Sequence, residues 1–236
     1  MIFGDLNQRG AKEILAGNPI AILPLGAVEV HGDHLPILTD VYLAEGVSRK
    51  VCEQLPNAIL LPSMPYGQIW SLRDKPGSIS LSDDTLSSFL CEVGRSLFGQ
   101  GVKRLAIING HVGNINAIKM AQRVLFDECD LKMYSFTYPG VEKSQEEVLT
   151  TKRPHKAYFH ACEIETSYML YLQPDKVDMT KAICQYPDFP PDFDVLPILW
   201  SKVMDTAVMG DATAATAKKG ETMINAVVAR IVALLS

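Results

Sequence analysis

The stretch Leu25–Asp40 gathers side chains that can bind a metal ion. Glu29 and His31 are two residues apart, so in an extended backbone both point to the same side. Asp40 follows at the expected start of a helix, and mixed oxygen and nitrogen ligands suit zinc, manganese or ferrous iron. The alternative interpretation is structural, with Glu29 exposed, His31 in a turn and Asp40 serving only as a helix cap.

A second segment, Ile107–Asn114, places His111 in a glycine-containing loop between an apolar run and a helical pattern. Gly110 and Gly113 allow the backbone to approach a ligand closely. Ligands of an open α/β sheet bind at the carboxyl ends of the strands, so we expect His111 at the same rim as the first segment. The alternative is a tight glycine and asparagine turn with an incidental histidine.

The third segment, Phe159–Ser167, carries His160 and Glu163 three residues apart, hence on one face of an expected helix. Such a pair can bring a ligand carboxylate and an acid–base imidazole together. Glu165 faces elsewhere on this helix and could brace neighbouring loops. The alternative is a capped helix start that faces solvent.

Apolar runs of strand length alternate with helical patterns and supply the frame for these segments. We expect strands at Pro19–Leu25, Ala58–Leu61, Arg104–Ile108 and Leu131–Thr137. We expect helices at Val41–Leu55, from Ser82 as cap to about Gly99, at Ile115–Glu128, at His160–Leu172 and from about Ala212 to the end. This alternation predicts a parallel sheet covered by helices on both faces.

Three long segments lack a regular pattern, and long loops inside a compact domain are usually functional. These segments are Ser63–Ser80, Tyr138–Tyr158 and Gln173–Met209. No repeat or linker interrupts the chain, so we expect a single domain over residues 1–236.

Composition excludes several classes of protein. The 236 residues are 47% hydrophobic and 21% charged, which excludes a disordered chain. A formal net charge of −5 argues against nucleic acid as a partner. Five cysteines without a C-x-x-C pair predict reduced thiols. The sequence shows neither a targeting signal nor a membrane span, so we expect a cytoplasmic protein without a membrane partner.

Four ordered motifs resemble those of the creatininase family of metal-dependent amidohydrolases. "LPLGAVEVHGDHLPILTD" resembles its Glu-x-His-Gly-x-His-Leu-Pro signature ending in Thr-Asp, and "NGHVGN" resembles its Asn-Gly-His-Gly-Gly-Asn element. "HACEIETS" is similar to its His-Ala-Gly-Glu-x-Glu-Thr-Ser element, and "GDATAATAKKGE" to its closing segment. The resemblance spans about Leu23 to the C-terminus. It implies a three-layer α/β/α sandwich with a mostly parallel central sheet.

The resemblance also implies two divalent metal ions per chain, with zinc as first choice and manganese or iron as alternatives. The implied ligands are Glu29, Asp40 and His111 for one ion and His31, Asp40 and Glu163 for the other. In creatininase itself the last ligand is a glutamate inside the Asn-Gly-His motif. This chain has Gly113 there, so Glu163 is the natural substitute. His160 matches the position of the family's catalytic histidine.

The implied reaction is hydrolysis of a C–N bond in a small cyclic amide or formamide by a metal-bridging hydroxide. His160 would act as general acid, backbone N–H groups near Gly110 and Gly113 would stabilise the oxyanion, and Asp33 or His34 would orient a ligand. One alternative is a hydrolase of the same family that opens a cyclic ketone of the inosose type by C–C cleavage. Another is a metal-binding protein without turnover, against which the retention of His160 argues.

The loop Tyr66–Ser80 departs from the family pattern, because the usual histidine is missing and Arg73 and Asp74 stand in its neighbourhood. We expect Arg73 and Trp70 to contact a small polar substrate. The alternative for Arg73 is a surface pair with Asp74.

The glycines Gly110 and Gly113 are expected to contact the substrate as well. The lid tryptophans of the family's namesake have no counterpart from Tyr138 to Tyr158, so creatinine is not the first choice of substrate. Family members are commonly hexamers, and we therefore expect a homo-oligomer. Cys162 is expected to be a buried, inert thiol, and His155 to be exposed to solvent.

Overall fold

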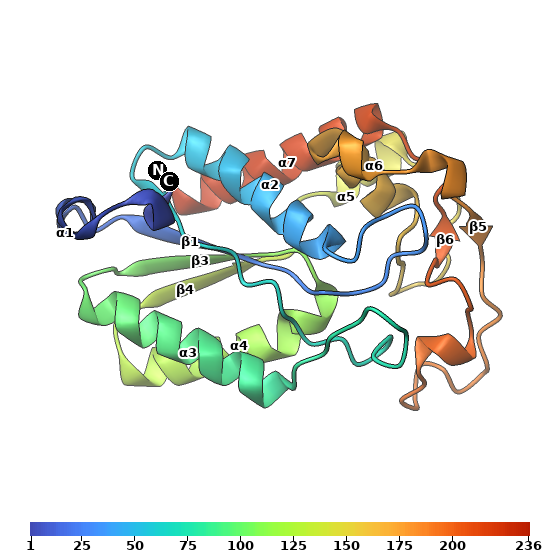
Figure 1. Cartoon of the computed structure of the whole chain (residues 1–236), viewed down its shortest axis with the longest axis horizontal. Coiled ribbons are helices and arrows are strands. Elements are labelled where there is room, and N and C mark those ends of the chain that lie inside the picture. Colours follow the sequence, from blue (N-terminus) through green and yellow to red (C-terminus); the bar gives the residue numbers. More distant parts are fainter.

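A computed structural model describes residues 1–236 and shows a parallel sheet between two layers of helices (Figure 1). The sheet has four strands in the order β2-β1-β3-β4. They are β1 (Ile20–Leu25), β2 (Ala58–Leu60), β3 (Arg104–Asn109) and β4 (Lys132–Phe136). Every neighbouring pair is parallel, as the alternation of strands and helices predicts.

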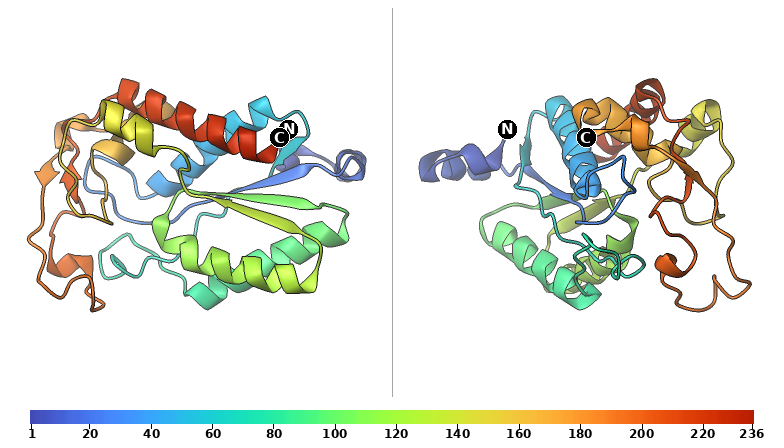
Figure 2. Two further views of the ribbon diagram at one scale, coloured as in Figure 1. Left: turned by 180° about the vertical axis from the view of Figure 1, so that it is seen from behind. Right: turned by 45° about the vertical axis from the view of Figure 1, so that its right-hand side comes forward.

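The helices divide between the two faces of the sheet, which confirms the three-layer sandwich (Figures 1 and 2). One face carries α2 (Thr39–Gln54), α5 (Glu142–Val148), α6 (Glu163–Leu172) and α7 (Ala217–Leu235). The other face carries α3 (Asp83–Gly99) and α4 (Ile115–Glu128). The remaining helix, α1 (Gln8–Ala16), lies at the end of the molecule where β1 begins (Figure 1).

Side chains of the central strands alternate between two apolar cores. Ile20 and Ile22 of β1 pack in the core beneath α2, α6 and α7, whereas Ala21 and Leu23 pack in the core beneath α3 and α4. All four are at most 4% exposed. A strand buried on both faces reads as an uninterrupted apolar run, which is why the pattern predicts it.

Two helices begin later than predicted. Helix α6 starts at Glu163, because His160 pairs in an antiparallel bridge with Met209 and Ala161 has a positive φ of 47°. Helix α7 starts at Ala217, where the side chain of Thr216 accepts a hydrogen bond from the Lys219 N–H. The residues before α7 instead form a short antiparallel ribbon, β6 (Gly210–Asp211) with β5 (Cys184–Gln185).

The long loops gather at one end of the molecule, beyond the carboxyl ends of the strands (Figure 1). Two helices were not predicted from the sequence. Helix α5 interrupts the segment Tyr138–Tyr158, and α1 precedes the first strand. None of the helices combines the length and apolar character that crossing a bilayer requires.

Candidate metal centre

Backbone contacts bring the first and second segments together at the carboxyl ends of β1 and β3. The Gly110 N–H donates to the Leu25 carbonyl at 2.8 Å, which continues the parallel register past the strand ends. A Cβ on Gly110 would overlap the Asp40 carbonyl, and one on Gly26 would overlap the backbone of Val41. Glycine at both positions therefore lets the first turn of α2 close against the strand ends.

Two asparagine side chains fix the loop that carries His111. The Asn109 amide donates to the His111 carbonyl at 2.7 Å, and the Asn114 amide donates to the Gly26 carbonyl at 3.0 Å. The Asn114 carbonyl oxygen accepts from the Gln68 N–H at 2.8 Å. The second motif thus joins the loops after β1, β2 and β3 around one point.

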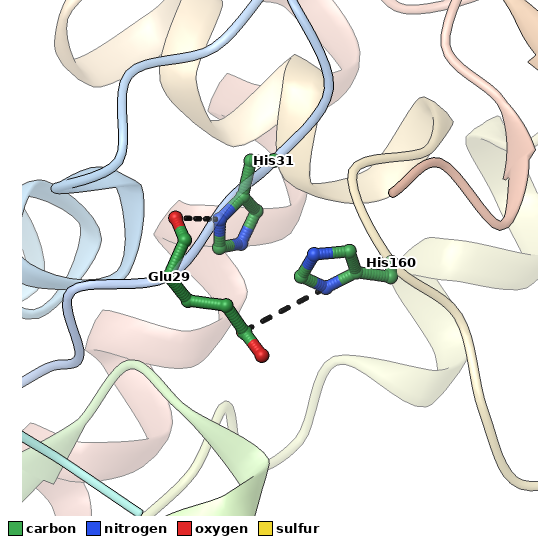
Figure 3. Close-up of side chains that lie close together, drawn as sticks. All are labelled: Glu29, His31 and His160. Carbon is green, nitrogen blue, oxygen red and sulfur yellow. Dashed lines mark hydrogen bonds and ion pairs between the residues drawn. The ribbon is translucent and has the colours of Figure 1, made fainter. Parts of the chain in front are cut away.

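Three imidazoles, two of them buried and that of His111 partly exposed, each bond a backbone carbonyl through one ring nitrogen. His31 Nδ1 lies 3.1 Å from the Glu29 carbonyl, His111 Nε2 lies 2.8 Å from that of Gln68, and His160 Nε2 lies 2.7 Å from that of Val30. Figure 3 shows the first of these bonds, with His160 beside it. Because a carbonyl only accepts, each of these nitrogens must carry the proton. The second nitrogen of each neutral ring is then an unprotonated lone pair.

The free nitrogens face carboxylates rather than donors. His31 Nε2 lies 3.2 Å from Asp40 Oδ1, and His111 Nδ1 lies 3.0 Å from Asp40 Oδ2 and 3.3 Å from Glu29 Oε2. The Glu29 carboxylate also reaches to within 3.9 Å of His160 Nδ1 (Figure 3). Lone pairs that face one another repel unless a proton or a metal cation lies between them.

Unpartnered buried atoms mark the same place. Glu29 Oε1, His31 Nε2 and Asp40 Oδ2 have no hydrogen-bond partner, although each residue is only 1% exposed. Buried polar atoms without partners are rare in proteins and costly. The donor set and its orphaned atoms therefore fit divalent cations.

The electrostatics of the chain's own groups agree with this fit. Burial by itself would lower the pKa of His31, but the Asp40 carboxylate outweighs it and raises that pKa to about 10. Burial acts in the same way on His111, where Glu29 and Asp40 raise the pKa to about 9. The carboxylates thus attract positive charge strongly at this point, as ligands of a cation do.

The possible ligand atoms form three overlapping groups, each with its atoms within 4.8 Å of one another. The groups are Glu29, Asp40 and His111; His31, Asp40 and Glu165; and Glu29, His31 and His160. Glu29, His31 and Asp40 each belong to two groups, and the two oxygens of Asp40 face His31 and His111 separately, as expected of a bridging carboxylate. All members come from the loops after β1 and β3, the first turn of α2 and the start of α6.

Glu163 does not lie in any of these groups, which corrects its predicted position. Its carboxylate accepts from Lys219 Nζ, from the Thr150 N–H at 3.0 Å and from Thr151 Oγ1 at 2.6 Å. His160 lies outside α6, so its spacing of three residues from Glu163 does not place the two side chains on one helical face, and Glu165 lies at the centre instead. Only a tight bond from the Ala161 N–H, at 2.6 Å, occupies Glu165.

Of the four residues predicted to contact the substrate, two line a cavity beside the centre and two do not. Trp70 and Gly113 line a cavity of about 570 Å³ that opens onto the centre. Arg73 does not line it, because its guanidinium lies over the Trp70 ring at 5.3 Å. Gly110 does not line it either, since it packs against the backbone of Asp40.

The two residues predicted to orient a ligand, His34 and Asp33, differ in their burial. His34 is buried, and its Nε2 lies 2.9 Å from Thr166 Oγ1 on the helix that carries Glu165. Asp33 is exposed and forms no hydrogen bond with the candidate ligands, so of the two residues His34 is the better placed for the predicted role. The Cys162 thiol is buried, as predicted, and burial raises its pKa to about 12, which disfavours the reactive thiolate.

His155 was expected at the surface, but its side chain is only 11% exposed. It stacks on Tyr158 at 5.0 Å and contacts the rings of Phe189 and Phe193. Tyr158 and Phe193, with Trp200, line the cavity. These aromatic residues and Glu165 are the site residues that sequence reasoning missed. The only sequence signal for the aromatic residues was that they fall in segments expected to be functional loops, whereas Glu165 lies in the third motif.

Known proteins resemble this chain over almost its whole length. The sequence model of the family described as "Creatininase: Creatinine amidohydrolase" matches residues 4–235. The creatinine amidohydrolase of Pseudomonas putida is 28% identical over 232 residues, which cover 89% of this chain and 86% of that protein. The mycofactocin precursor peptide peptidase of Mycobacterium tuberculosis H37Rv is 30% identical over 247 residues, with coverages of 96% and 88%.

Solved structures agree with the sequence matches. A crystal structure of creatinine amidohydrolase superposes with a TM-score of 0.86 at 28% identity, covering 99% of this chain and 96% of that one. Further creatininase structures with the same fold include an Mn form and one described as Zn-Zn type. With its motifs, its fold and its candidate metal site, this chain belongs to the creatininase family of hydrolases.

Proposed function

We propose that this protein is a binuclear-metal hydrolase that cleaves a C–N amide bond. The observation that carries the proposal is the arrangement of His31, His111 and His160. Each ring commits one nitrogen to a backbone carbonyl and turns the other toward buried carboxylates. Histidine ligands in metal sites are oriented by such carbonyl bonds.

The two proposed metal sites share Asp40. Glu29 and His111 complete one site, and His31 and Glu165 complete the other, with Glu165 in place of the predicted Glu163. Zinc or manganese is the proposed metal, because solved relatives are described with these ions and because oxygen and nitrogen ligands suit both.

Two divalent cations would polarise the scissile carbonyl and lower the pKa of an attacking water. His160 is the residue that we propose to move the proton. Its Nε2–H is held by the Val30 carbonyl, so Nδ1 is free to accept a proton from the water and to donate it to the leaving nitrogen. The rings of His31 and Trp200, at 4.2 and 5.8 Å, fix its orientation.

The relatives support an amide as substrate. Both named relatives that align over most of their own length hydrolyse C–N bonds by name, one as an amidohydrolase and one as a peptide peptidase. This favours amide hydrolysis over the ring-opening alternative. A homo-oligomer remains a prediction from the family resemblance, and light scattering of the purified protein would test it.

Replacing the shared carboxylate tests the proposal. In Asp40→Asn, the metal content measured by elemental analysis should fall from two ions per chain to below one, and hydrolysis of an amide panel should stop. Asp33→Asn, on the same loop but exposed, is the matched control and should keep both. Two ions retained in Asp40→Asn would overturn the assignment of the centre.

A second variant separates the two possible roles of His160, which also belongs to a ligand group. His160→Asn should keep both ions and lose turnover by about 10²–10⁴-fold, as removal of a positioned acid–base group does. Loss of one ion with that variant would make His160 a ligand instead.

A further inference from the structure

We propose that the amide substrate carries an uncharged aromatic or branched aliphatic group on its amine side, which binds in the cavity beside the centre. This inference rests on the proposed function for the reaction, but the binding preference can be measured without turnover. It replaces the small polar substrate expected from the sequence.

The size of the cavity favours a substrate with a bulky substituent. Its volume of about 570 Å³ lies within the range of pockets that enclose drug-sized ligands. A single small ring with polar edges would leave most of this space to water. Apolar side chains such as Val112 and Leu196, each 55% exposed, would remain uncovered by such a substrate. Covering this apolar surface is a source of binding free energy that only a larger group can use.

The lining carries no charged side chain beyond the residues of the centre. Its other polar side chains include Gln68, Ser71 and Asn116, all of which are neutral. They can form hydrogen bonds with amide groups, but they cannot compensate a buried charge. Arg73, the cation that could have bound an anionic group, lies over Trp70 outside the lining. A charged substituent would therefore be desolvated without a partner.

An aromatic wall begins at the proposed proton-transfer residue. Trp200 meets His160 edge to face at 5.8 Å, Tyr158 meets Trp200 at 5.7 Å, and Phe193 meets Tyr158 at 6.1 Å. Since His160 is proposed to donate to the leaving nitrogen, the group attached to that nitrogen is the one that reaches this wall. The geometry thus assigns the apolar group to the amine side.

The wall is held in place before a substrate binds. His155 stacks on Tyr158 at 5.0 Å, and its Nε2 lies 3.2 Å from Asp194 Oδ1. The Trp200 N–H donates to the Ser71 carbonyl at 2.9 Å, which ties the wall to the loop of Trp70. A wall ordered in advance loses little conformational entropy on binding, so its preference should be measurable.

Tryptophan fluorescence can report binding directly, because the chain has only two tryptophans and both line the cavity. The probes are N-acetylglycyl-phenylalaninamide, N-acetylglycyl-glycinamide and N-acetylglycyl-aspartamide, titrated into the manganese-loaded protein and, to exclude hydrolysis during the titration, into its His160→Asn variant. The phenylalanine probe should bind at least about 10-fold more tightly than the glycine probe, and the aspartate probe should bind most weakly. Equal affinity for the three probes would overturn the inference.

Variants of the aromatic wall test which residues cause the preference for the phenylalanine probe. In Trp200→Ala the ratio of phenylalanine to glycine affinity, reported by Trp70, should fall to about 1, whereas Trp200→Phe should keep part of it. Phe126→Ala, which removes an 83% exposed ring outside the cavity, should leave the ratio unchanged. Phe193→Ala, farther along the wall, should lower the ratio less than Trp200→Ala and serves if Trp200→Ala fails to fold. An unchanged ratio in both wall variants would refute the assignment.

The two proposals fail in different ways. Selective binding of the phenylalanine probe without hydrolysis of any probe would refute the proposed function and leave the binding preference standing. Hydrolysis of the glycine and phenylalanine probes with equal kcat/KM would refute the inference and leave the amide hydrolase standing.

Discussion

Glu163 and Glu165 stand two residues apart on the first turn of α6, yet their surroundings are opposite. Both side chains are buried, with exposures of 1% and 9%. Glu163 accepts hydrogen bonds from Lys219 and from two threonines, so the chain supplies its countercharge. Glu165 accepts one bond from the Ala161 N–H and lies with His31 and Asp40 in a candidate ligand group.

The difference shows how a structural carboxylate can be told from a ligand carboxylate. Burial by itself would raise the pKa of Glu163, but the bonds from Lys219 and the threonines outweigh it and lower that pKa. Burial raises the pKa of Glu165 to about 7, because the attraction of His31 only partly offsets the loss of water and the Asp40 carboxylate adds to the rise. A buried carboxylate whose charge the chain offsets only in part is the one that an external cation would complete.

The sharpest test of this comparison exchanges each glutamate for glutamine. Glu165→Gln should lose at least one ion per chain by elemental analysis and lower turnover by about 100-fold or more, because a first ligand is weakened. Glu163→Gln is the matched variant, and its metal content should equal that of the unchanged protein. If the two variants lost metal equally, the distinction between the two glutamates would be wrong.

The same pair of variants can be compared without turnover. Metal at about 100 times its Kd should stabilise the unchanged protein and Glu163→Gln by about 2.7 kcal/mol per site. In Glu165→Gln that stabilisation should be smaller, which thermal unfolding with and without chelator would show. An equal rise of Tm in both variants would count against Glu165 as a ligand.

Removing Lys219, the internal cation that pairs with Glu163, should lower the stability of the fold and leave metal binding at the centre unchanged. Lys219→Met leaves the buried Glu163 without its charged partner, and we expect the free energy of unfolding to fall by about 3 kcal/mol. Urea unfolding measures this change. The double variant Lys219→Met with Glu163→Leu should recover part of the loss, because no charge is left unpaired. Metal content that falls with Lys219→Met in the folded protein would contradict the separation of the two regions.

The smallest expected effect follows from the loss of Thr151, a neutral hydrogen-bond donor to the Glu163 carboxylate. Thr151→Val removes the 2.6 Å hydrogen bond to Glu163 and keeps the shape of the side chain. We expect a loss of about 1 kcal/mol in the free energy of unfolding, since the other donors remain. Thr213→Val is a suitable control, because the Thr213 hydroxyl donates to Asp211 Oδ1 at an exposed site. This variant should lose less free energy of unfolding.

Most of the fold was predictable because buried parallel strands and amphipathic helices leave strong local patterns. The strand Ile20–Leu25 and the helix Ile115–Glu128 match their predictions within a residue at each end. The starts of α6 and α7 were not predictable, since a bridge from His160 to Met209 and the ribbon of β5 and β6 depend on distant partners. Helical propensity near those ends could not reveal these contacts.

The sequence by itself determined the kinds of candidate ligand and the strand ends that carry them. Glu29, His31, Asp40 and His111 follow from local motifs, because a parallel sheet brings the carboxyl ends of its strands to one edge. The choice between Glu163 and Glu165 was decided only by the tertiary structure. The packing of α6 turns Glu165 toward His31 and Asp40, and Lys219, far along the chain, pairs with the carboxylate of Glu163.

The aromatic wall was likewise a product of tertiary structure. Tyr158 comes from one irregular segment, and Phe193 and Trp200 come from another, and neither segment shows a periodicity. Their common surface exists because loops with no regular pattern are positioned by packing against one another, through contacts such as that of His155 with Tyr158 and Phe193. Local sequence encodes the chemistry of each side chain, whereas only the folded chain decides which side chains meet.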